Sequence, residues 1–581
     1  MPIHRHVRDG TQGESVSASV DDKLKITRRL VAFGVDFVEA GWPGSNPKDA
    51  AFFTRAKTDL THAERDKLVA FGSTRRKRVR ANEDPQVQAL LESQAPTVCI
   101  VAKAHAWQVT EILRATLDEN LDMIRDTVAC LVAHGRVVMV DLEHALDGYA
   151  TDPDYVHACC RAAVDGGASV LVACDTNGGT MPWRVGTVVR ELVDTYGPQG
   201  VTIGMHAHND CGMAVANSLT AAQYGAGLIQ GTVNGIGERT GNADLCAIVP
   251  SLALHVQAQL HCRASLATLT SLSRFVDEVL NQTPNHAAPF VGSSAFAHKG
   301  GLHVAAMERS PLSYQHIEPE LVGNEQRILI SELSGRQNIL GKMQQAGVDL
   351  GTSGSDRAVA ILNRVKTLEA QGYTFEGAEA SVHLMILHAT KGYCPPFQVL
   401  DYSAQVYDAN IDSATRVLRH TESPDTDPTD SKKPRKAPGF GPTARATVNV
   451  RTMRPIEDGL ESYLANLSPY QDRLEVSDGN GPVDALANAL MRALQPVHPI
   501  LQHVELVDYK VRILDAENAT GATTRVMIEF RNNSDGDQET WTTVSVDTNV
   551  ISASLNALVD GFEYALIEHG ESCMLCHLDD M

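Results

Sequence analysis

The sequence lacks a disulfide framework, a membrane-spanning run and a secretory leader. Its 11 cysteines are scattered without regular spacing, which is typical of reduced thiols. No segment approaches the ~18 consecutive apolar residues that a membrane span requires. The first ten residues, MPIHRHVRDG, lack the apolar region of a secretory signal. These absences predict a cytoplasmic protein that does not enter a membrane.

Positive charge is also in deficit. The chain has 50 Lys and Arg residues against 71 Asp and Glu residues, a net charge of −21. Such a chain repels phosphate backbones and anionic lipids, so we expect neither a nucleic-acid partner nor a membrane-surface role. Hydrophobic residues make up 43% of the 581 positions, which predicts well-formed cores distributed over two to four folding units.

The first half of the sequence alternates short β-branched runs with amphipathic helices such as 20–33 and 154–165. This alternation is typical of parallel βα units. A short strand before Arg8 brings the number of strands to eight, so we expect an α/β fold with a closed (β/α)8 TIM barrel over residues 1–285. The other seven strands are expected at 35–40, 67–73, 97–102, 137–143, 169–174, 201–206 and 228–233.

The second half predicts several smaller parts. Residues 286–418 mix helical pieces with Gly-rich turns and are expected to form linking subdomains that complete the active site. The Pro-rich segment 419–442 carries acids followed by bases and predicts a disordered linker. Residues 443–570 contain a weak repeat of strands followed by an apolar helix, which predicts a pseudo-symmetric α+β regulatory domain. Residues 571–581 are expected to be a tail.

Polar side chains gather where the predicted barrel strands end, and this end carries the active site in TIM barrels. Residues i and i+2 of a strand face the same side, so His206 and His208 project together into the barrel mouth. Together with Asp9 they form a two-His, one-carboxylate set for a divalent ion, and Asn242 offers a further oxygen. An isolated HxH pair is more often merely polar, but the barrel context and Asp9 favour a metal site. The ligands do not distinguish Zn2+, Mn2+ and Mg2+.

Seven motifs occur in order along the chain: RDGTQGES (8–15), EAGWPGSNPKD (39–49), CDTNGG (174–179), HAHND (206–210), NGIGERTGNADL (234–245), SAFAHKGGLHVAA (294–306) and ELSGR (332–336). Together they resemble those of the 2-isopropylmalate/homocitrate/citramalate synthase family. YQHIEPELVGNE (314–325) and GWPGSNPKDAAFF are most similar to the citramalate synthase branch. The resemblance covers nearly the whole chain. It implies an acyltransferase that condenses acetyl-CoA with a 2-oxoacid on a divalent metal and then hydrolyses the thioester.

The resemblance also implies roles for single residues. The implied metal ligands are Asp9, His206, His208 and Asn242. Arg8 would polarise the oxoacid carbonyl, Thr176 would hold the oxoacid carboxylate, and Asn177 would contribute to substrate binding.

The enolising base remains open between Glu143 and His303, since either can stand within reach of the acetyl methyl group. Glu143 has a second interpretation, in which it orients Arg8. His303 and Tyr314 match residues that the family's linking subdomain brings to the site, often from the other protomer of a homodimer. Tyr314 could instead serve packing alone.

The expected activity is that of a citramalate synthase, which uses pyruvate in isoleucine biosynthesis. The nearest alternative is a 2-isopropylmalate synthase, which uses the larger 2-oxoisovalerate in leucine biosynthesis. The positions expected to line the oxoacid pocket are polar, which favours the smaller substrate. They are Trp42, Ser73, Lys103 and Asp141.

Two further alternatives belong to other functional classes. The atypical strand IHRH before Arg8 leaves open a truncated start and a non-catalytic, effector-binding homologue. A metal-dependent aldolase or lyase on the same barrel would not need the linking and C-terminal regions. For the synthase, the C-terminal domain is expected to bind an end-product amino acid, either isoleucine or leucine.

Overall fold

The computed structural model contains two compact units. One comprises Met1–Ala297 and Gln315–Arg327, and the other comprises His298–Tyr314 and Ile328–Met581. The described residues are 3–310, 313–331, 334–348, 354–390, 392–406, 444–453, 470–533 and 539–569. The linker predicted at 419–442 and the tail predicted at 571–581 lie outside them.

The first unit is a closed barrel of eight parallel strands in sequence order. The strands are β1 (Ile3–His6), β2 (Phe37–Gly41), β3 (Leu68–Ser73), β4 (Thr97–Lys103), β5 (Val137–Glu143), β6 (Val170–Asp175), β7 (Thr202–Ala207) and β8 (Leu228–Gly231). Strand β1 pairs with both β2 and β8, so the atypical IHRH segment closes the barrel. The predicted (β/α)8 fold is confirmed, and every strand falls within a few residues of its predicted range.

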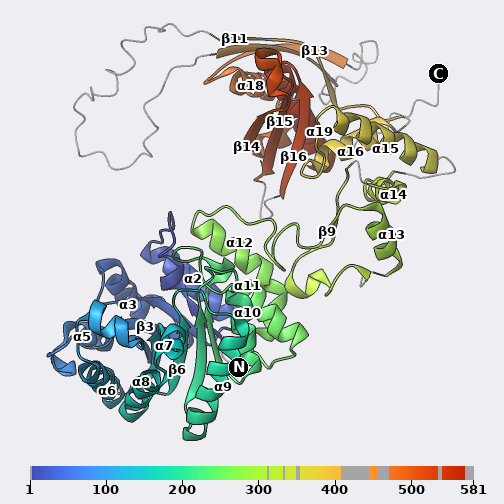
Figure 1. Cartoon of the computed structure of the whole chain (residues 1–581). Coiled ribbons are helices and arrows are strands. Elements are labelled where there is room, and N and C mark those ends of the chain that lie inside the picture. The colour runs from blue at the N-terminus through green and yellow to red at the C-terminus, as the bar shows by residue number, and fades with distance from the viewer. Residues whose placement is uncertain are drawn as a thin grey trace, which may run out of the picture. The chain divides into compact units, whose positions relative to one another are not determined.

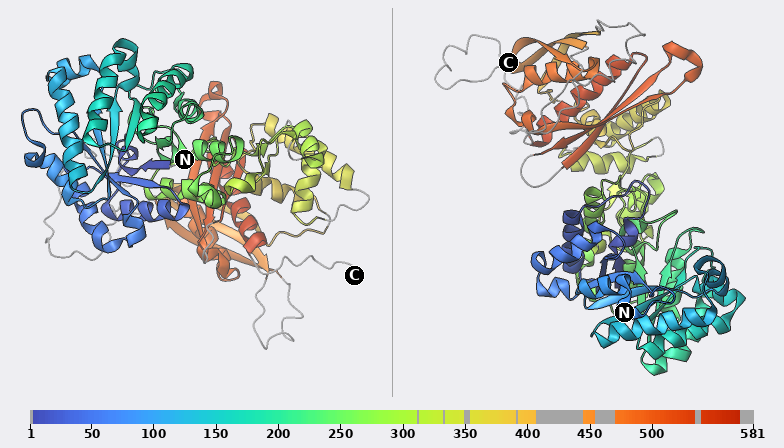
Figure 2. Two further views of the ribbon diagram at one scale, coloured as in Figure 1. Left: turned by 90° about the horizontal axis from the view of Figure 1, so that it is seen from below. Right: turned by 90° about the vertical axis from the view of Figure 1, so that its left-hand side faces the viewer.

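Helices enclose the strands, as the left view of Figure 2 shows. The helices are α1 (Val7–Gly10), α2 (Val20–Phe33), α3 (Pro47–Asp59), α4 (His62–Arg65), α5 (Pro85–Glu92), α6 (Leu117–Ala133), α7 (Ala145–Thr151), α8 (Pro153–Gly166), α9 (Pro182–Tyr196), α10 (Ala214–Gln223), α11 (Leu245–Pro250) and α12 (Leu269–Val279). Helix α2 matches its predicted range because both of its ends are encoded locally. Ser19 and Asp22 form a capping box, and Gly34 ends the helix with a φ of 96°.

The second unit contains two three-stranded antiparallel sheets, each followed by a long helix (Figure 1). The first sheet has β11 (Phe397–Val406), β12 (Ala444–Met453) and β13 (Tyr470–Gly479), followed by α18 (Pro482–Leu494). The second has β14 (Val504–Ile513), β15 (Thr524–Asn532) and β16 (Glu539–Asp547), followed by α19 (Val550–His569). One apolar core contains residues of both sheets and both helices. This arrangement is the pseudo-symmetric module that the internal repeat predicted.

The sheet that contains β11 crosses a predicted boundary. Strand β11 lies in the range predicted as linking subdomain, 286–418, yet it pairs with β12 along its length. A strand is defined by its partner, so the sequence alone could not assign it to the C-terminal module. Among the described residues of this unit, the remaining α-helices are α13 (Gly301–Arg309), α14 (Arg336–Gln345), α15 (Gly354–Ala370) and α16 (Glu379–His388). The short strands β9 (Ala297–His298) and β10 (Arg327–Ile328) pair with each other.

Helix α19 is long and apolar enough to span a membrane by length and composition alone. It contributes Leu555, Leu558 and Phe562 to the core of the C-terminal module, so a core helix of this module accounts for its apolar character.

Candidate active site

Three of the predicted metal ligands come together at the carboxyl ends of neighbouring strands. His206 lies in β7 and His208 directly follows it, and their ring centroids are 5.1 Å apart. Asp9 lies in the short helix α1 after β1, and its Oδ2 is 3.8 Å from Nε2 of His206. Asp9 and His206 are both buried, each with 6% of its surface exposed. Because β7, β8 and β1 are consecutive around the barrel, strand order explains this meeting of distant residues.

Asn242 supplies the observation that tests whether these residues fit a metal ion. The main chain of Asn242 pairs with that of His208 in an isolated β-bridge, and 3% of the surface of Asn242 is exposed. The amide nitrogen donates to the carbonyl of Ile236, while the buried Oδ1 has no hydrogen-bond partner. Leaving such an acceptor unsatisfied costs about 1–3 kcal/mol, which a bound ligand would recover. One carboxylate, two imidazoles and an amide oxygen therefore suit a divalent ion.

Among the described residues, no group of three or more His, Cys, Asp or Glu side chains is arranged as a metal site. His208 takes part in another contact: Arg239 Nη2 lies 2.9 Å from its Nδ1. The assignment of Asp9, His206, His208 and Asn242 as ligands therefore stays a prediction.

Arg239 joins three of the sequence motifs. It makes two hydrogen bonds of 2.8 Å with the carboxylate of Asp210 and donates to the main-chain carbonyl of Thr176. The hydrogen bonds from Arg239 lower the pKa of Asp210. HAHND, CDTNGG and NGIGERTGNADL are thus held in one arrangement. Arg239 lies within the NGIGERTGNADL motif of the sequence, but only the fold shows these contacts.

Glu143, one of the two candidate bases, ends β5. Its Oε2 lies 2.6 Å from Nζ of Lys103, the last residue of β4. The two strands are neighbours in register, with Lys103 opposite Glu143, which explains the pair. The side chain of Arg8 is not among those described, so the interpretation in which Glu143 orients Arg8 stays a prediction.

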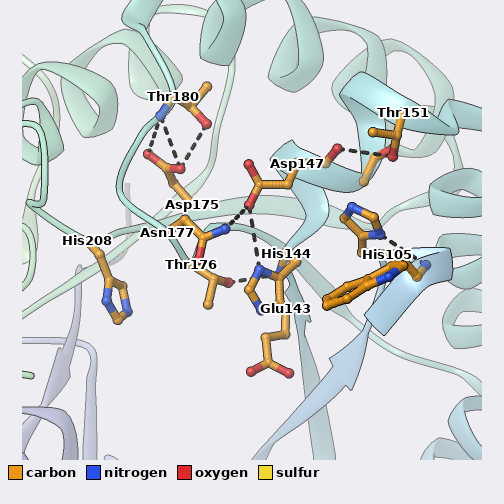
Figure 3. A network of polar contacts seen from close by, with 12 residues as sticks. His105, Glu143, His144, Asp147, Thr151, Asp175, Thr176, Asn177, Thr180 and His208 are labelled. Atoms are coloured by element: carbon orange, nitrogen blue, oxygen red, sulfur yellow. Dashed lines mark hydrogen bonds and ion pairs between the residues drawn. The ribbon is translucent and has the colours of Figure 1, made fainter. Parts of the chain in front are cut away.

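Thr176 and Asn177 take part in a polar network just beyond β6 (Figure 3). The Thr176 hydroxyl accepts a hydrogen bond from the main-chain N–H of His144, and Asn177 donates to Asp147 Oδ2 at 2.7 Å. Interaction with His144 lowers the pKa of Asp147. Sequence reasoning missed His144, which directly follows a predicted strand, and Asp147, which lies in the first turn of α7. The predicted substrate contacts of Thr176 and Asn177 stay predictions.

His303 and Tyr314 stack on each other, with ring centroids 4.1 Å apart. His303 lies in the first turn of α13, and half of the Tyr314 surface is exposed. Both residues belong to the second unit. Their approach to the barrel mouth stays a prediction.

Gly237 leaves the space that Asn242 occupies. A Cβ at position 237 would lie 2.1 Å from Asn242 Nδ2. We expect Gly237→Ala to displace this amide and to weaken metal binding by about 10-fold, the lower end of losses seen when ligand positioning is disturbed. Isothermal titration of the metal-free protein with Mn2+ measures the change. Gly179→Ala is the control, because its Cβ would meet nothing within 4 Å. Equal affinities in both variants would contradict the role of Asn242.

Comparison with known proteins places the chain in a family. The HMGL-like model matches residues 3–276, the homocitrate synthase post-HMGL domain-like model matches 290–372, and the LeuA allosteric (dimerisation) domain matches 443–566. The (R)-citramalate synthase of Synechocystis sp. is 43% identical over 96% of this chain and 95% of its own length. That of Aquifex aeolicus is 40% identical over 98% of both chains.

A relative with a different substrate matches a smaller part. The 2-isopropylmalate synthase of Sulfolobus acidocaldarius is 30% identical over 64% of this chain and 92% of its own length. The two citramalate synthases cover 96% and 98% of this chain, against 64% for the 2-isopropylmalate synthase. The chain belongs to the 2-isopropylmalate/homocitrate/citramalate synthase family, in its (R)-citramalate synthase branch.

Proposed function

We propose that this protein is an (R)-citramalate synthase, which condenses acetyl-CoA with pyruvate, hydrolyses the thioester and serves isoleucine biosynthesis. The similarity to citramalate synthases over 96–98% of the chain carries this proposal. The nine described cysteines are free thiols, which agrees with a cytoplasmic location.

The predicted site residues have separate roles in the proposed reaction. The proposed holders of the divalent ion are Asp9, His206, His208 and Asn242. The ion, when bound, polarises the oxoacid carbonyl. Arg8 adds positive charge where the alkoxide develops, and such fixed charge stabilises the transition state. Either Glu143 or His303 takes the proton from the acetyl methyl group, and Thr176 holds the oxoacid carboxylate.

The loop after β3 is a candidate site for the phosphates of acetyl-CoA. Residues 74–80 read TRRKRVR, and Arg76, Lys77, Arg78 and Arg80 are exposed at the carboxyl end of the barrel. Coenzyme A is a polyanion, and a cationic mouth would offset the repulsion from a chain of net charge −21. We expect the double variant R76E/R78E to raise the KM for acetyl-CoA about tenfold, since each exposed charge pair contributes up to ~1 kcal/mol. The KM for pyruvate should not change. An equal rise in both constants would contradict the assignment.

We propose that the C-terminal module binds a branched amino acid, isoleucine or leucine, and that the protein is a homodimer. A cavity of about 460 Å3 in this module has mainly apolar walls. Apolar side chains that line it include Met491, Leu506, Phe530, Leu558 and Phe562. Asp484 on its wall could receive the ammonium group.

Filling this cavity tests the regulatory proposal. We expect Met491→Trp to abolish inhibition by either amino acid and to leave the uninhibited kcat within about twofold. The substitution removes the coupling free energy between the two sites, typically ~1–3 kcal/mol, and changes no residue that is proposed to act in the reaction. The same assay on the parent protein is the reference. If millimolar isoleucine and leucine left the activity of the parent protein unchanged, this result would contradict regulation by these amino acids.

The release of free thiol from acetyl-CoA tests the proposed reaction. Mn2+ or Mg2+ is supplied, and pyruvate, 2-oxobutyrate and 2-oxoisovalerate are compared in parallel. We expect the highest kcat/KM with pyruvate. A preference for 2-oxoisovalerate would assign the protein to leucine biosynthesis with the same mechanism. Metal binding without thiol release from any oxoacid would favour the non-catalytic homologue.

A further inference from the structure

We propose that Gln230 is a positioning residue, which with Asp141 behind it fixes the tautomer and orientation of His206 for metal binding. This inference rests on the metal site of the proposed function. It gives a role in metal binding to Gln230 and Asp141, two barrel residues that are not themselves proposed as ligands.

The three side chains form a continuous chain of hydrogen bonds inside the barrel. Gln230 Oε1 lies 2.9 Å from Nδ1 of His206, and Gln230 Nε2 donates to Asp141 Oδ1 at 3.0 Å. His206 comes from β7, Gln230 from β8 and Asp141 from β5. Gln230 is 0% exposed and Asp141 4% exposed, so water cannot replace either contact. The chain therefore runs from β5 to the ligand-bearing strand.

The polarity of this chain runs in one direction. Gln230 Nε2 donates to a carboxylate oxygen of Asp141, which is an acceptor, so Asp141 holds the amide nitrogen of Gln230. The amide oxygen must then face His206, and an oxygen acceptor requires a proton on Nδ1. In the neutral imidazole the lone pair consequently lies on Nε2. Nε2 is the atom 3.8 Å from Asp9 Oδ2, which is too far for a direct hydrogen bond.

A purely structural role explains this arrangement poorly. Interiors of such barrels are filled mainly by branched apolar side chains. A buried amide and carboxylate carry a desolvation cost that an apolar side chain of similar volume would avoid. Cys99 lies beside the carboxylate of Asp141. Burial and the neighbouring Asp141 raise the pKa of the Cys99 thiol, so the thiol keeps its proton and can donate it in a hydrogen bond. Outer partners of metal-bound histidines are known to fix the tautomer and the ring orientation in this way.

Titration of the full-length, metal-free protein with Co2+ tests the inference, with the visible d–d bands as the readout and no substrate present. We expect Gln230→Met to weaken Co2+ binding about 10–100-fold, the usual cost of removing such a partner. Asp141→Asn should weaken it less, since Gln230 keeps an acceptor toward His206 but no longer has a fixed orientation. Gln88→Met on the outer helix α5 is the matched control and should bind like the parent.

An exchange of the two groups separates positioning from packing. In the double variant Q230E/D141N a carboxylate faces His206 and an amide donates to it from behind, so the polarity toward His206 is kept. We expect the Co2+ affinity of the double variant to be within about threefold of that of the parent. The comparison of the double variant with the parent tests the inference even if Gln230→Met does not fold. Parent affinity in Gln230→Met, or no recovery in the exchange variant, would overturn the inference. A parent protein that does not bind Co2+ would instead overturn the metal site of the proposed function.

Discussion

Replacing His206 with alanine is expected to abolish stoichiometric metal binding and to lower kcat at least ~10³-fold. A metal ion acting as Lewis acid contributes several kcal/mol to the stabilisation of developing charge, and ~4 kcal/mol corresponds to this factor. His206 is the best-defined donor because its Nδ1 is bonded to Gln230 while Nε2 faces Asp9. Metal analysis of the purified variant and thiol release from acetyl-CoA with pyruvate measure the two effects.

His134→Ala provides the matched control for this variant. His134 lies in the short turn between the end of α6 and the start of β5, so it lies at the end of the barrel opposite the site. It should retain both metal and activity. A His206→Ala protein that keeps its metal and loses less than about tenfold in kcat would exclude the proposed ligand set, because such a loss corresponds to only ~1.4 kcal/mol.

Replacing Asp560 with asparagine is expected to stabilise the second unit at pH 8 and to have little effect at pH 4. Burial, reinforced by neighbouring Glu563, raises the pKa of Asp560 to about 7. The side chain faces Ser381 and lies beside His388, which together with Tyr393 is hydrogen-bonded to Glu563. This cluster joins α16 and α19 of the same unit.

The sign of the effect follows from proton linkage. The folded state holds the Asp560 proton up to about pH 7, whereas the unfolded chain releases it near the ordinary aspartate pKa of 3.8. Stability from this group is therefore present below the unfolded pKa and is lost as the pH rises through 7. The full cost of ionisation is of order 4 kcal/mol, and asparagine removes it.

Scanning calorimetry at pH 4 and pH 8 measures this difference. The exposed Asp356 in the first turn of α15 provides the control, since Asp356→Asn should change the midpoint much less than Asp560→Asn and should not raise it at pH 8. The raised pKa of His388, caused mainly by its hydrogen bond to Glu563, lowers stability over the same rise in pH. His388 is common to the parent and Asp560→Asn, so their comparison isolates Asp560. A variant less stable than the parent at pH 8 would contradict the account.

The sequence predicted the barrel well because its signals are local. Apolar runs of strand length alternate with capped helices, and His206 and His208 share a face through strand periodicity. The partners of these residues could not be predicted. Gln230 and Asp141 are 89 positions apart and meet only when β5 to β8 close the barrel.

Local sequence also left the C-terminal module incompletely assigned. The repeat predicted strands followed by α18 and by α19, but β11 belongs to this module through its pairing with β12. The segment between them spans 407–443, and no local signal crosses it. Likewise, the contacts of His144 with Thr176 and of Asp147 with Asn177 depend on β5 and β6 lying side by side.

Identification of the product tests the central claim most directly. The full-length protein is incubated with a divalent metal, acetyl-CoA and 13C-labelled pyruvate, and the product is analysed by chiral chromatography with mass spectrometry while free thiol is counted. We predict labelled (R)-citramalate with one free CoA thiol for each molecule formed. A CoA thioester product without free thiol, or no labelled product from pyruvate while 2-oxoisovalerate is consumed, would contradict the assignment.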